Sequence, residues 1–157
     1  MSRRGRTIAA AVLAAAMAGG QLVSCGGPAA EDTARSFLKR WQEGRGRAAG
    51  ELTTAKPAAV ADQFDRAFAE LGAGRPRLRL DSVQEDDGKA TVTFRATLRL
   101  GPLDVNWSYR GRFTLREDDG GRWRVAWAPS VVHPALEKGD NLRLNRQFAT
   151  RAPILAR

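Results

Sequence analysis

Alternation of apolar and polar residues predicts a sheet in the second half of the chain. In the clearest run, residues 90–100, every second residue is apolar, and threonine or arginine fills the positions between them. Further runs with the same period occur at 77–81, 105–115 and 123–127. Successive side chains of a strand point to opposite faces of a sheet, so each run has one apolar and one polar face. We expect about four strands.

A helical period of apolar residues precedes these strands. The first stripe consists of Ala34, Phe37, Leu38 and Trp41, and the second of Val60, Phe64, Ala67, Phe68 and Leu71. Asp32 or Thr33 is the expected N-cap of the first helix, and Pro57 suits the first turn of the second. Each helix must bury one face, and the sheet offers an apolar one. The chain is therefore predicted to have an α+β fold, with two N-terminal helices packed on a curled antiparallel sheet.

The string Glu-Asp-Asp-Gly occurs in two connections between the predicted strands, at Glu85–Gly88 and Glu117–Gly120. Asp-Gly between alternating runs indicates a hairpin, because glycine adopts the positive φ that tight turns need. Paired carboxylates also suggest a cation site, but calcium needs about six to eight oxygen ligands at defined spacing. Neither string supplies that pattern. We interpret both acidic pairs, Asp86-Asp87 and Asp118-Asp119, as turns.

Residues 1–24 have the pattern of a lipoprotein signal peptide. Arg3, Arg4 and Arg6 precede an alanine-rich apolar run that is too short and too weakly apolar for a comfortable membrane span. The run ends in Leu-Val-Ser-Cys, which resembles a lipobox, and Cys25 is the only cysteine of the chain. We expect lipid on Cys25, a tether over 25–31, and a location on the extracytoplasmic face of the bacterial cell membrane. The alternative is an ordinary secretory signal.

The chain is basic. Removal of the signal peptide lowers the formal net charge from +9 to +6, because that segment holds three arginines and no acid. Outside the cytoplasm such a chain is attracted to anionic lipid and anionic cell-wall polymer, and we expect no nucleic-acid partner. The arginines expected on the outer face of the sheet are Arg95, Arg99, Arg110, Arg112, Arg122 and Arg124. They contact wall polymer, lipid headgroups or a partner protein, or they form a solvated face, which is the interpretation we favour.

Two further parts of the sequence contain residue types that occur in catalytic or metal sites. Ser36 and Lys39 form the S-x-x-K pattern of penicillin-recognising enzymes. That nucleophile needs a cleft lined by S-x-N and K-T-G, strings that do not occur in the chain, so we interpret it as a solvated helix face. His133 is the only histidine of the chain, so it has no second histidine with which to share a metal. We expect no catalytic, cofactor-binding or metal-binding residue.

The inward positions of the predicted sheet are almost entirely apolar, with Tyr109 and Ser82 as the only polar exceptions. Asp104, at a strand edge, is the only carboxylate that we consider for a cavity mouth. General acid–base catalysis needs a titratable group aimed at a pocket, and the pattern does not show one. Trp107, Trp123 and Trp127 occupy apolar phases of their strands, so we expect them in the core.

The run that ends the sheet continues into a distinctive segment, Trp123–Asp140. At Pro129 the alternation stops, because proline removes a backbone donor and restricts the residue before it. Residues 130–134 are expected to form an extended connecting arm. The segment closely resembles the end of the non-catalytic N-terminal domain of class B penicillin-binding proteins of the methicillin-resistance type. The matching residues are Trp123, Val125, Trp127, Pro129, Ser130, Val131, His133, Pro134, Leu136, Gly139 and Asp140.

The resemblance implies a nuclear-transport-factor-2-like (NTF2-like), or cystatin-like, cone over residues 32–140. It also implies a non-catalytic, lipid-anchored spacer that orients a peptidoglycan transpeptidase, with a role in cell-wall synthesis and the beta-lactam response. In the family a motif of the form R-G-x-I-x-D-R begins the next domain. Arg151, Ile154 and Arg157 match it, whereas Ala152 and Ala156 depart from it. We therefore expect 141–157 to be an extended tail, the start of a missing domain, and mobile after about Phe148.

Two alternative functions remain open from the sequence. One is a free-standing lipoprotein that binds a small apolar ligand in the cone, and the other is a cone-fold enzyme such as an isomerase or hydratase. The interior distinguishes them: a filled interior favours the spacer, an open apolar interior the binder, and an inward carboxylate the enzyme.

Overall fold

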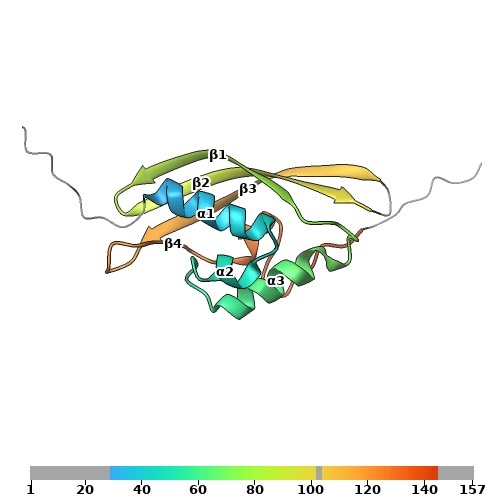
Figure 1. The fold of residues 1–157 in the computed structure, drawn as a ribbon, viewed down its shortest axis with the longest axis horizontal. Helices are drawn as coiled ribbons and strands as arrows, with labels where there is room; N and C mark the ends of the chain where they lie inside the picture. The colour runs from blue at the N-terminus through green and yellow to red at the C-terminus, as the bar shows by residue number, and fades with distance from the viewer. Residues whose placement is uncertain (1–28, 102–103, 145–157) are drawn as a thin grey trace, which may run out of the picture.

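The computed structural model describes residues 29–101 and 104–144, and the predicted signal peptide, Cys25 and the last part of the tail lie outside them. The sheet is one antiparallel meander of four strands in the order β1-β2-β3-β4 (Figure 1). The strands are β1 (Arg77–Asp86), β2 (Lys89–Leu100), β3 (Val105–Glu117) and β4 (Trp123–Val125). The predicted α+β class and the curled sheet are confirmed.

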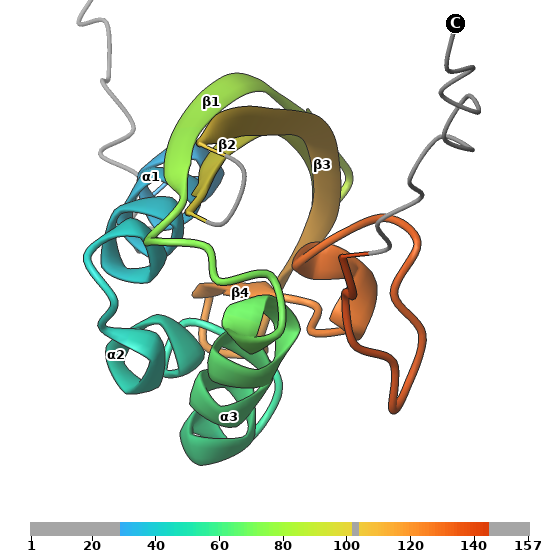
Figure 2. The same ribbon diagram turned by 90° about the vertical axis from the view of Figure 1, so that its right-hand side faces the viewer.

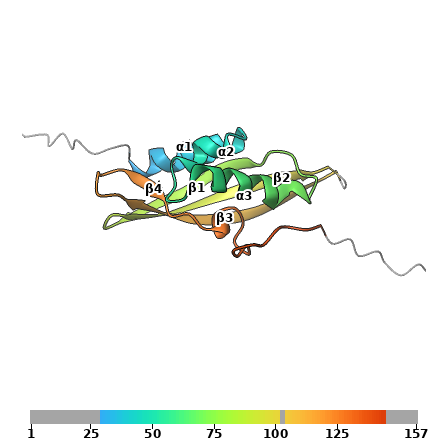
Figure 3. The ribbon, with the colours of Figure 1, turned by 90° about the horizontal axis from the view of Figure 1, so that it is seen from below.

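Three helices lie on one side of the sheet, namely α1 (Ala30–Gln42), α2 (Gly46–Gly50) and α3 (Pro57–Ala69). Viewed along the strands, the long strands form an arc that the helices close from below (Figure 2). Seen from below, the chain after β4 runs beside β3 (Figure 3). The three helices and the sheet thus enclose one core.

The first helix begins earlier than predicted. Its N-cap is Ala29, which makes no side-chain capping bond, and Asp32 and Thr33 both lie inside the helix. The start of α1 therefore falls within the stretch predicted as a tether. Thr33 is buried, whereas Asp32 lies in the first turn, where a carboxylate interacts favourably with the helix dipole. The expectation of a cap at Asp32 or Thr33 is wrong.

The short helix α2 was not predicted. Its sequence, Gly-Arg-Ala-Ala-Gly, has two glycines and is too short to show an apolar period. Tertiary contacts hold it in place instead: Ala49 is fully buried, and Arg40 Nη1 donates a hydrogen bond to the carbonyl oxygen of Ala48 at 2.7 Å.

The core lies between the helices and the inner face of the sheet. On β2, every second residue from Ala90 to Leu100 is buried, as the alternation predicts. Trp41 of α1 stacks on Phe64 of α3 with ring centroids 4.7 Å apart. Opposite Phe94, β3 carries Gly111, where a Cβ atom would lie 2.2 Å from the Phe94 ring. The glycine therefore makes room for an aromatic side chain.

Ser82 does not point inward. Between Leu80 and Ser82 the register of β1 against β2 shifts, because Asp81 is an extra residue in a β-bulge. A bulge reverses the alternation of every residue that follows it. Ser82 is consequently exposed on the outer face, where its Oγ lies 2.7 Å from Thr93 Oγ1, and the predicted inward position is wrong.

Both Glu-Asp-Asp-Gly strings lie at hairpins, but they turn differently. Between β1 and β2, Asp87 and Gly88 both have positive φ, 40° and 70°, as a two-residue turn of this type requires. Between β3 and β4, the positive φ falls on Gly121 instead. There the Asp118 carboxylate accepts hydrogen bonds from the backbone N–H groups of Gly120 and Arg122.

The arm after β4 is not extended throughout. Residues Pro129–Val131 form a short 3₁₀ helix, η1, and Val132 continues with a helical φ and ψ. Proline fixes a φ that suits the first turn of a helix as well as an extended chain, and burial of Val131 and Val132 favours the helical turn. Leu142 and Leu144, in the predicted extended tail, lie outside any strand but pack against the core. The predicted mobility after Phe148 concerns residues outside the described range.

Candidate functional site

Aromatic rings fill the interior of the cone. Phe37, Trp41, Phe64, Phe94 and Phe113 are all buried, and each lies within a ring-centroid distance of 6.3 Å of at least one other. A hollow of about 310 Å³ remains at the mouth, between α1, α3 and the chain that leads into β1. That volume is at the lower end for a ligand pocket, about 300–1,000 Å³.

No carboxylate of the described residues points into this interior. Asp65 lies at the rim of the hollow and is exposed. Asp104, considered from the sequence for a cavity mouth, lies in the connection after β2, and its Oδ1 accepts a hydrogen bond from Arg99 Nε at 2.9 Å. Its side chain is 74% exposed. The described interior therefore lacks a group placed for general acid–base catalysis.

On the inner side of the sheet, Tyr109 carries a polar hydroxyl group, which binds the arm. Its hydroxyl donates a hydrogen bond to the backbone carbonyl of Val132, which is fully buried. Burial raises the pKa of the Tyr109 hydroxyl above its usual value, so the group stays protonated and keeps its donor. Tyr109 connects β3 to the segment by which the chain leaves the sheet.

His133 completes this attachment. Its ring centroid lies 4.7 Å from that of Tyr109 and 5.3 Å from that of Trp107, and its Nδ1 accepts a hydrogen bond from the Ala135 backbone N–H at 3.2 Å. Burial lowers the pKa of His133, which favours the neutral ring. Within 29–101 and 104–144, no group of three or more His, Cys, Asp or Glu residues is placed to hold a metal ion. His133 lies in the arm, where the sequence placed it.

The structure also gives the positions of the S-x-x-K motif and of the three tryptophans that were expected in the core. Ser36 and Lys39 are exposed on α1, opposite the buried Phe37 and Leu38. The three tryptophans expected in the core, Trp107, Trp123 and Trp127, are only half-buried, although each packs against it. The fully enclosed indole ring is that of Trp41, which is 3% exposed.

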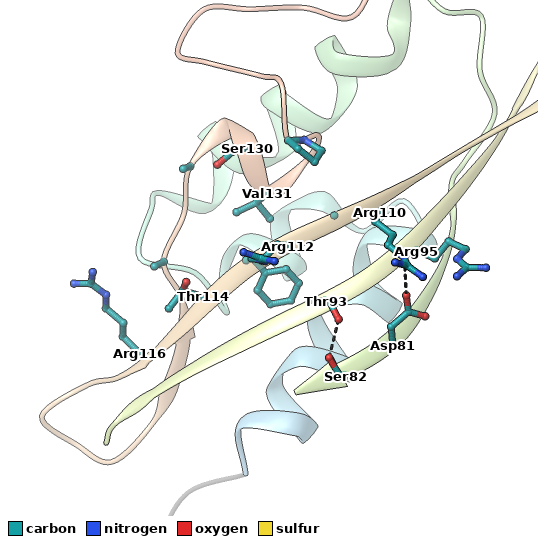
Figure 4. Close-up of a pocket in the computed structure, with 15 residues that line it drawn as sticks. Asp81, Ser82, Thr93, Arg95, Arg110, Arg112, Thr114, Arg116, Ser130 and Val131 are labelled. Carbon is teal, nitrogen blue, oxygen red and sulfur yellow. Dashed lines mark hydrogen bonds and ion pairs between the residues drawn. The ribbon is translucent and has the colours of Figure 1, made fainter. Parts of the chain in front are cut away.

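The outer face of the sheet carries an open groove of about 990 Å³, which lies between the sheet and the arm (Figure 4). Four arginines line it, Arg95 from β2 and Arg110, Arg112 and Arg116 from β3. Hydroxyl groups of Ser82, Thr93, Thr114 and Ser130 lie among them. We call this surface the arginine groove.

The structure divides the arginines that the sequence placed outward. Arg99, Arg122 and Arg124 have carboxylate partners, Asp104 for the first and Asp118 for the other two. The hydrogen bond from Arg124 is the main cause that lowers the pKa of Asp118. Arg95 and Arg112 have no ion pair within the described residues, and Arg110 has a long one, 4.0 Å from its Nε to Asp81 Oδ2. Arg116 is not among the predicted outward arginines, although it continues the alternation of Arg110, Arg112 and Thr114 along β3.

A curled antiparallel sheet closed by three helices, with a filled core and an arm bound at its edge, defines an NTF2-like cone. Residues 29–140, more than half of the chain, match the family described as the NTF2-like N-terminal transpeptidase domain. The protein belongs to this family, as its C-terminal segment indicates. The family is the non-catalytic N-terminal part of transpeptidases.

Several solved structures of low sequence identity are similar to this chain. A protein of ketosteroid isomerase-like fold from Catenulispora acidiphila is 9% identical, with a TM-score of 0.50 over 60% of this chain and 80% of that one. A ketosteroid isomerase-like protein from Erwinia carotovora atroseptica is 18% identical, with a TM-score of 0.48 over 61% and 87%. A cystatin-fold protein from Novosphingobium aromaticivorans is 11% identical, with a TM-score of 0.48 over 64% and 97%. No curated protein matches the chain.

In the part of the chain that the structure describes, none of the helices has the length and apolar character needed to cross a membrane.

Proposed function

We propose that this protein is a non-catalytic, lipid-anchored spacer domain of a penicillin-binding protein, which holds a peptidoglycan transpeptidase at a fixed distance and orientation from the membrane. The observation that carries the proposal is the attachment of the arm. A domain that orients its neighbour must transmit its own orientation through the segment that leaves it, and a loose segment does not do so.

The contacts of the arm meet this requirement. Val131, Val132 and Leu136 are buried, and Tyr109 donates its hydroxyl hydrogen to the carbonyl of Val132. Two backbone hydrogen bonds stabilise the turn with which the arm begins. Val131 N–H donates to the carbonyl of Ala128, and Val132 N–H donates to the carbonyl of Pro129, each at 2.9 Å. The arm is thus a packed continuation of the core.

The filled interior supports the same function over the two alternatives. A ligand binder needs an open cavity, whereas Phe37, Trp41 and Phe94 occupy the space between helices and sheet. A cone-fold isomerase or hydratase needs an acid or base in that space, and Tyr109, with its pKa raised by burial, is engaged with the arm. Neither alternative has a specific observation in its favour.

Anchoring through lipid on Cys25 is the membrane-facing half of the proposal. It rests on the sequence, in which an arginine-rich start and an apolar run precede a lone cysteine. In a Cys25→Ser variant we expect release from the membrane fraction or accumulation of an unprocessed precursor. Mass spectrometry that finds an unmodified Cys25 in a processed chain contradicts the anchor.

The spacer function is tested in cells that lack the native gene and carry one of three versions of it. These are the wild type, Cys25→Ser, and Cys25→Ser preceded by an unrelated membrane-spanning helix. The cross-linked fraction of the muropeptides and the susceptibility to beta-lactams are measured for each. We expect Cys25→Ser to change both and the replacement anchor to restore both, because a spacer depends on attachment and not on the nature of the anchor. If deletion of the gene changes neither quantity, the proposed function is wrong.

Reactivity with beta-lactams separates the spacer from a transpeptidase. Fluorescent penicillin is expected not to label the purified chain, because Ser36 is exposed on a helix face and lines none of the hollows described above. Ser36→Ala is the matched control, with the same background signal as the wild type. Covalent labelling that disappears in Ser36→Ala contradicts the non-catalytic assignment.

A further inference from the structure

The register of the sheet places three arginines in one row. Arg79 on β1 lies directly opposite Arg95 on β2, and Arg95 lies directly opposite Arg110 on β3. Residues that are directly opposite share a face, with Cβ atoms about 4.5–5.5 Å apart. All three residues are exposed on the outer face, away from the helices. We call these three residues the arginine row.

Within the described residues, few acidic groups compensate the positive charge of this row. Arg79 and Arg95 form no ion pair or side-chain hydrogen bond there, and Arg110 has only the Asp81 carboxylate at 4.0 Å. Like charges directly opposite each other on neighbouring strands destabilise a sheet. By contrast, Arg99 lies four residues beyond Arg95 on the same face of β2 and pairs with Asp104. The arrangement therefore leaves uncompensated positive charge where the arginine groove begins.

The groove extends this charge in the strand direction. Arg112 lies opposite Thr93, and Arg116 lies opposite Lys89, so cationic groups continue from the row along β3. The hydroxyls of Ser82, Thr93 and Thr114 lie beside them, and η1 with Ser130 forms the opposite wall (Figure 4). The surface is an open groove whose polar lining consists of guanidinium and hydroxyl groups and one carboxylate, that of Asp81.

These features fit a linear phosphodiester polymer. A single extended chain fits between the sheet-side arginines and η1 and contacts several arginines at once. Guanidinium groups match phosphate and carboxylate oxygens alike. A phosphodiester is tetrahedral, so one group bridges guanidinium ions on neighbouring strands and still accepts a hydrogen bond from a hydroxyl. A linear chain of phosphodiesters presents one such anion in every repeat, so successive repeats reach successive arginines.

We propose that the arginine row and the arginine groove bind a linear phosphodiester polymer, with successive phosphates on Arg79, Arg95 and Arg110 and on Arg112 and Arg116. This inference is independent of the spacer function, which depends on the arm and on the anchor. Contact with an anionic polymer on the side of the sheet opposite the helices leaves the interior of the cone unchanged.

The test uses the full chain in detergent and synthetic poly(glycerol phosphate) carrying a fluorescent end label. Fluorescence anisotropy gives the dissociation constant as a function of salt concentration. The binding variant is Arg79→Gln/Arg95→Gln/Arg110→Gln. The matched control is Arg35→Gln/Arg45→Gln/Arg99→Gln, which removes the same charge from exposed arginines that already have the carboxylate partners Glu31, Glu43 and Asp104.

We expect the binding variant to lose about tenfold or more in affinity, and the slope of log affinity against log salt to fall by about 2–3 units, because about one unit disappears with each phosphate contact. The control is expected to keep the wild-type slope and to lose affinity by less than about threefold, through net charge alone. Thermal unfolding of the binding variant checks the fold. A melting temperature at or above that of the wild type shows that lost binding is not lost structure.

Three results overturn the proposal. Equal loss in the two triple variants means that binding follows net charge and not the row. Binding to vesicles containing phosphatidylglycerol that is as tight as polymer binding, and equally sensitive to the row, means that the ligand is a membrane surface. Tighter binding of poly-glutamate than of poly(glycerol phosphate) means that the groove is a carboxylate site.

Discussion

The inner and outer faces of β2 carry alternate side chains of one strand in two environments. Val92, Phe94 and Leu98 are fully buried under the helices, and the residues between them are threonine and arginine that no helix covers. On the inner side, shape decides what fits, because aromatic rings touch on every side. On the outer side, no helix covers the strand, so the charges of the side chains and the register of the strands decide the electrostatic properties of the surface. Substitutions on the two faces are therefore expected to change the free energy of unfolding in different directions as well as by different amounts.

The largest effect is expected where the inner face is most enclosed, at Trp41→Ala. Removal of a buried indole costs about 3–5 kcal/mol of unfolding free energy, out of about 5–15 kcal/mol for a typical domain. Ser36→Ala on the exposed side of the same helix is the control and is expected to stay within about 0.5 kcal/mol of the wild type. Urea unfolding measures both. Equal midpoints for Trp41→Ala and wild type would mean that the core does not depend on this ring.

The next effect concerns shape on the inner face, at Gly111→Ala. The added Cβ would lie 2.2 Å from Phe94 Cζ, and overpacking of this kind costs about 1–3 kcal/mol. Gly74→Ala is the control, because a Cβ there meets nothing within 4 Å. Thermal unfolding compares the two, and adding Phe94→Leu to Gly111→Ala is expected to recover part of the loss. A Gly111→Ala protein as stable as the wild type contradicts the close approach.

Tyr109→Phe separates the arm from the rest of the inner face. The substitution leaves the buried carbonyl of Val132 without its donor, which costs about 1–3 kcal/mol. Hydrogen exchange with peptide mapping is expected to show lost protection over 131–136, with β2 unchanged. Ser82→Ala, which removes an exposed hydroxyl, is the control. Uniform loss of protection over the whole domain would show that the arm is not a separate attachment.

On the outer face a truncation is expected to stabilise. Arg95→Thr removes the central charge of the arginine row and adds a side chain that suits a strand, so stability rises by about 0.2–1 kcal/mol at low ionic strength. The gain disappears at about 1 M salt, where the screening length is about 3 Å. Arg99→Thr is the control, because it removes the ion-pair partner of Asp104, so no gain in stability is expected. Thermal unfolding at two salt concentrations checks the sign, and a destabilised Arg95→Thr contradicts it.

The smallest effect concerns His133, half-buried between Tyr109 and Trp107. Burial lowers its pKa in the folded protein, so below its ordinary value near pH 6.5 the unfolded chain binds more protons than the folded one. Stability therefore falls as the pH falls through that value, and levels off below the folded pKa. His133→Gln is expected to remove this component. Urea midpoints between pH 7.5 and pH 5 that are parallel in variant and wild type would exclude the contribution.

Periodicity predicted the phases of both faces in most places, because alternation and helical spacing are local properties of a chain. The inward residues of β2 and the stripe of α3 follow directly from it. It failed at Ser82, since one extra residue at Asp81 reverses the phase, and no turn or glycine marks the bulge in the sequence. It also failed at η1, because a proline permits both a helical turn and an extended arm, and burial of Val131 chose between them.

The sequence by itself determined the class of fold, the family and the hairpin at Asp87-Gly88, because each depends on residues that are near one another in the chain. Only the tertiary structure decided which arginines stand opposite one another. Arg79, Arg95 and Arg110 are separated along the chain, and their alignment depends on the register of two strand pairs. Likewise, the contact of Tyr109 with Val132 joins a strand to the arm. Several registers of a strand pair share the same alternation, and long-range pairing selects one of them. The period therefore predicts which face of the sheet a residue occupies, but not which residues of the adjacent strands lie opposite it.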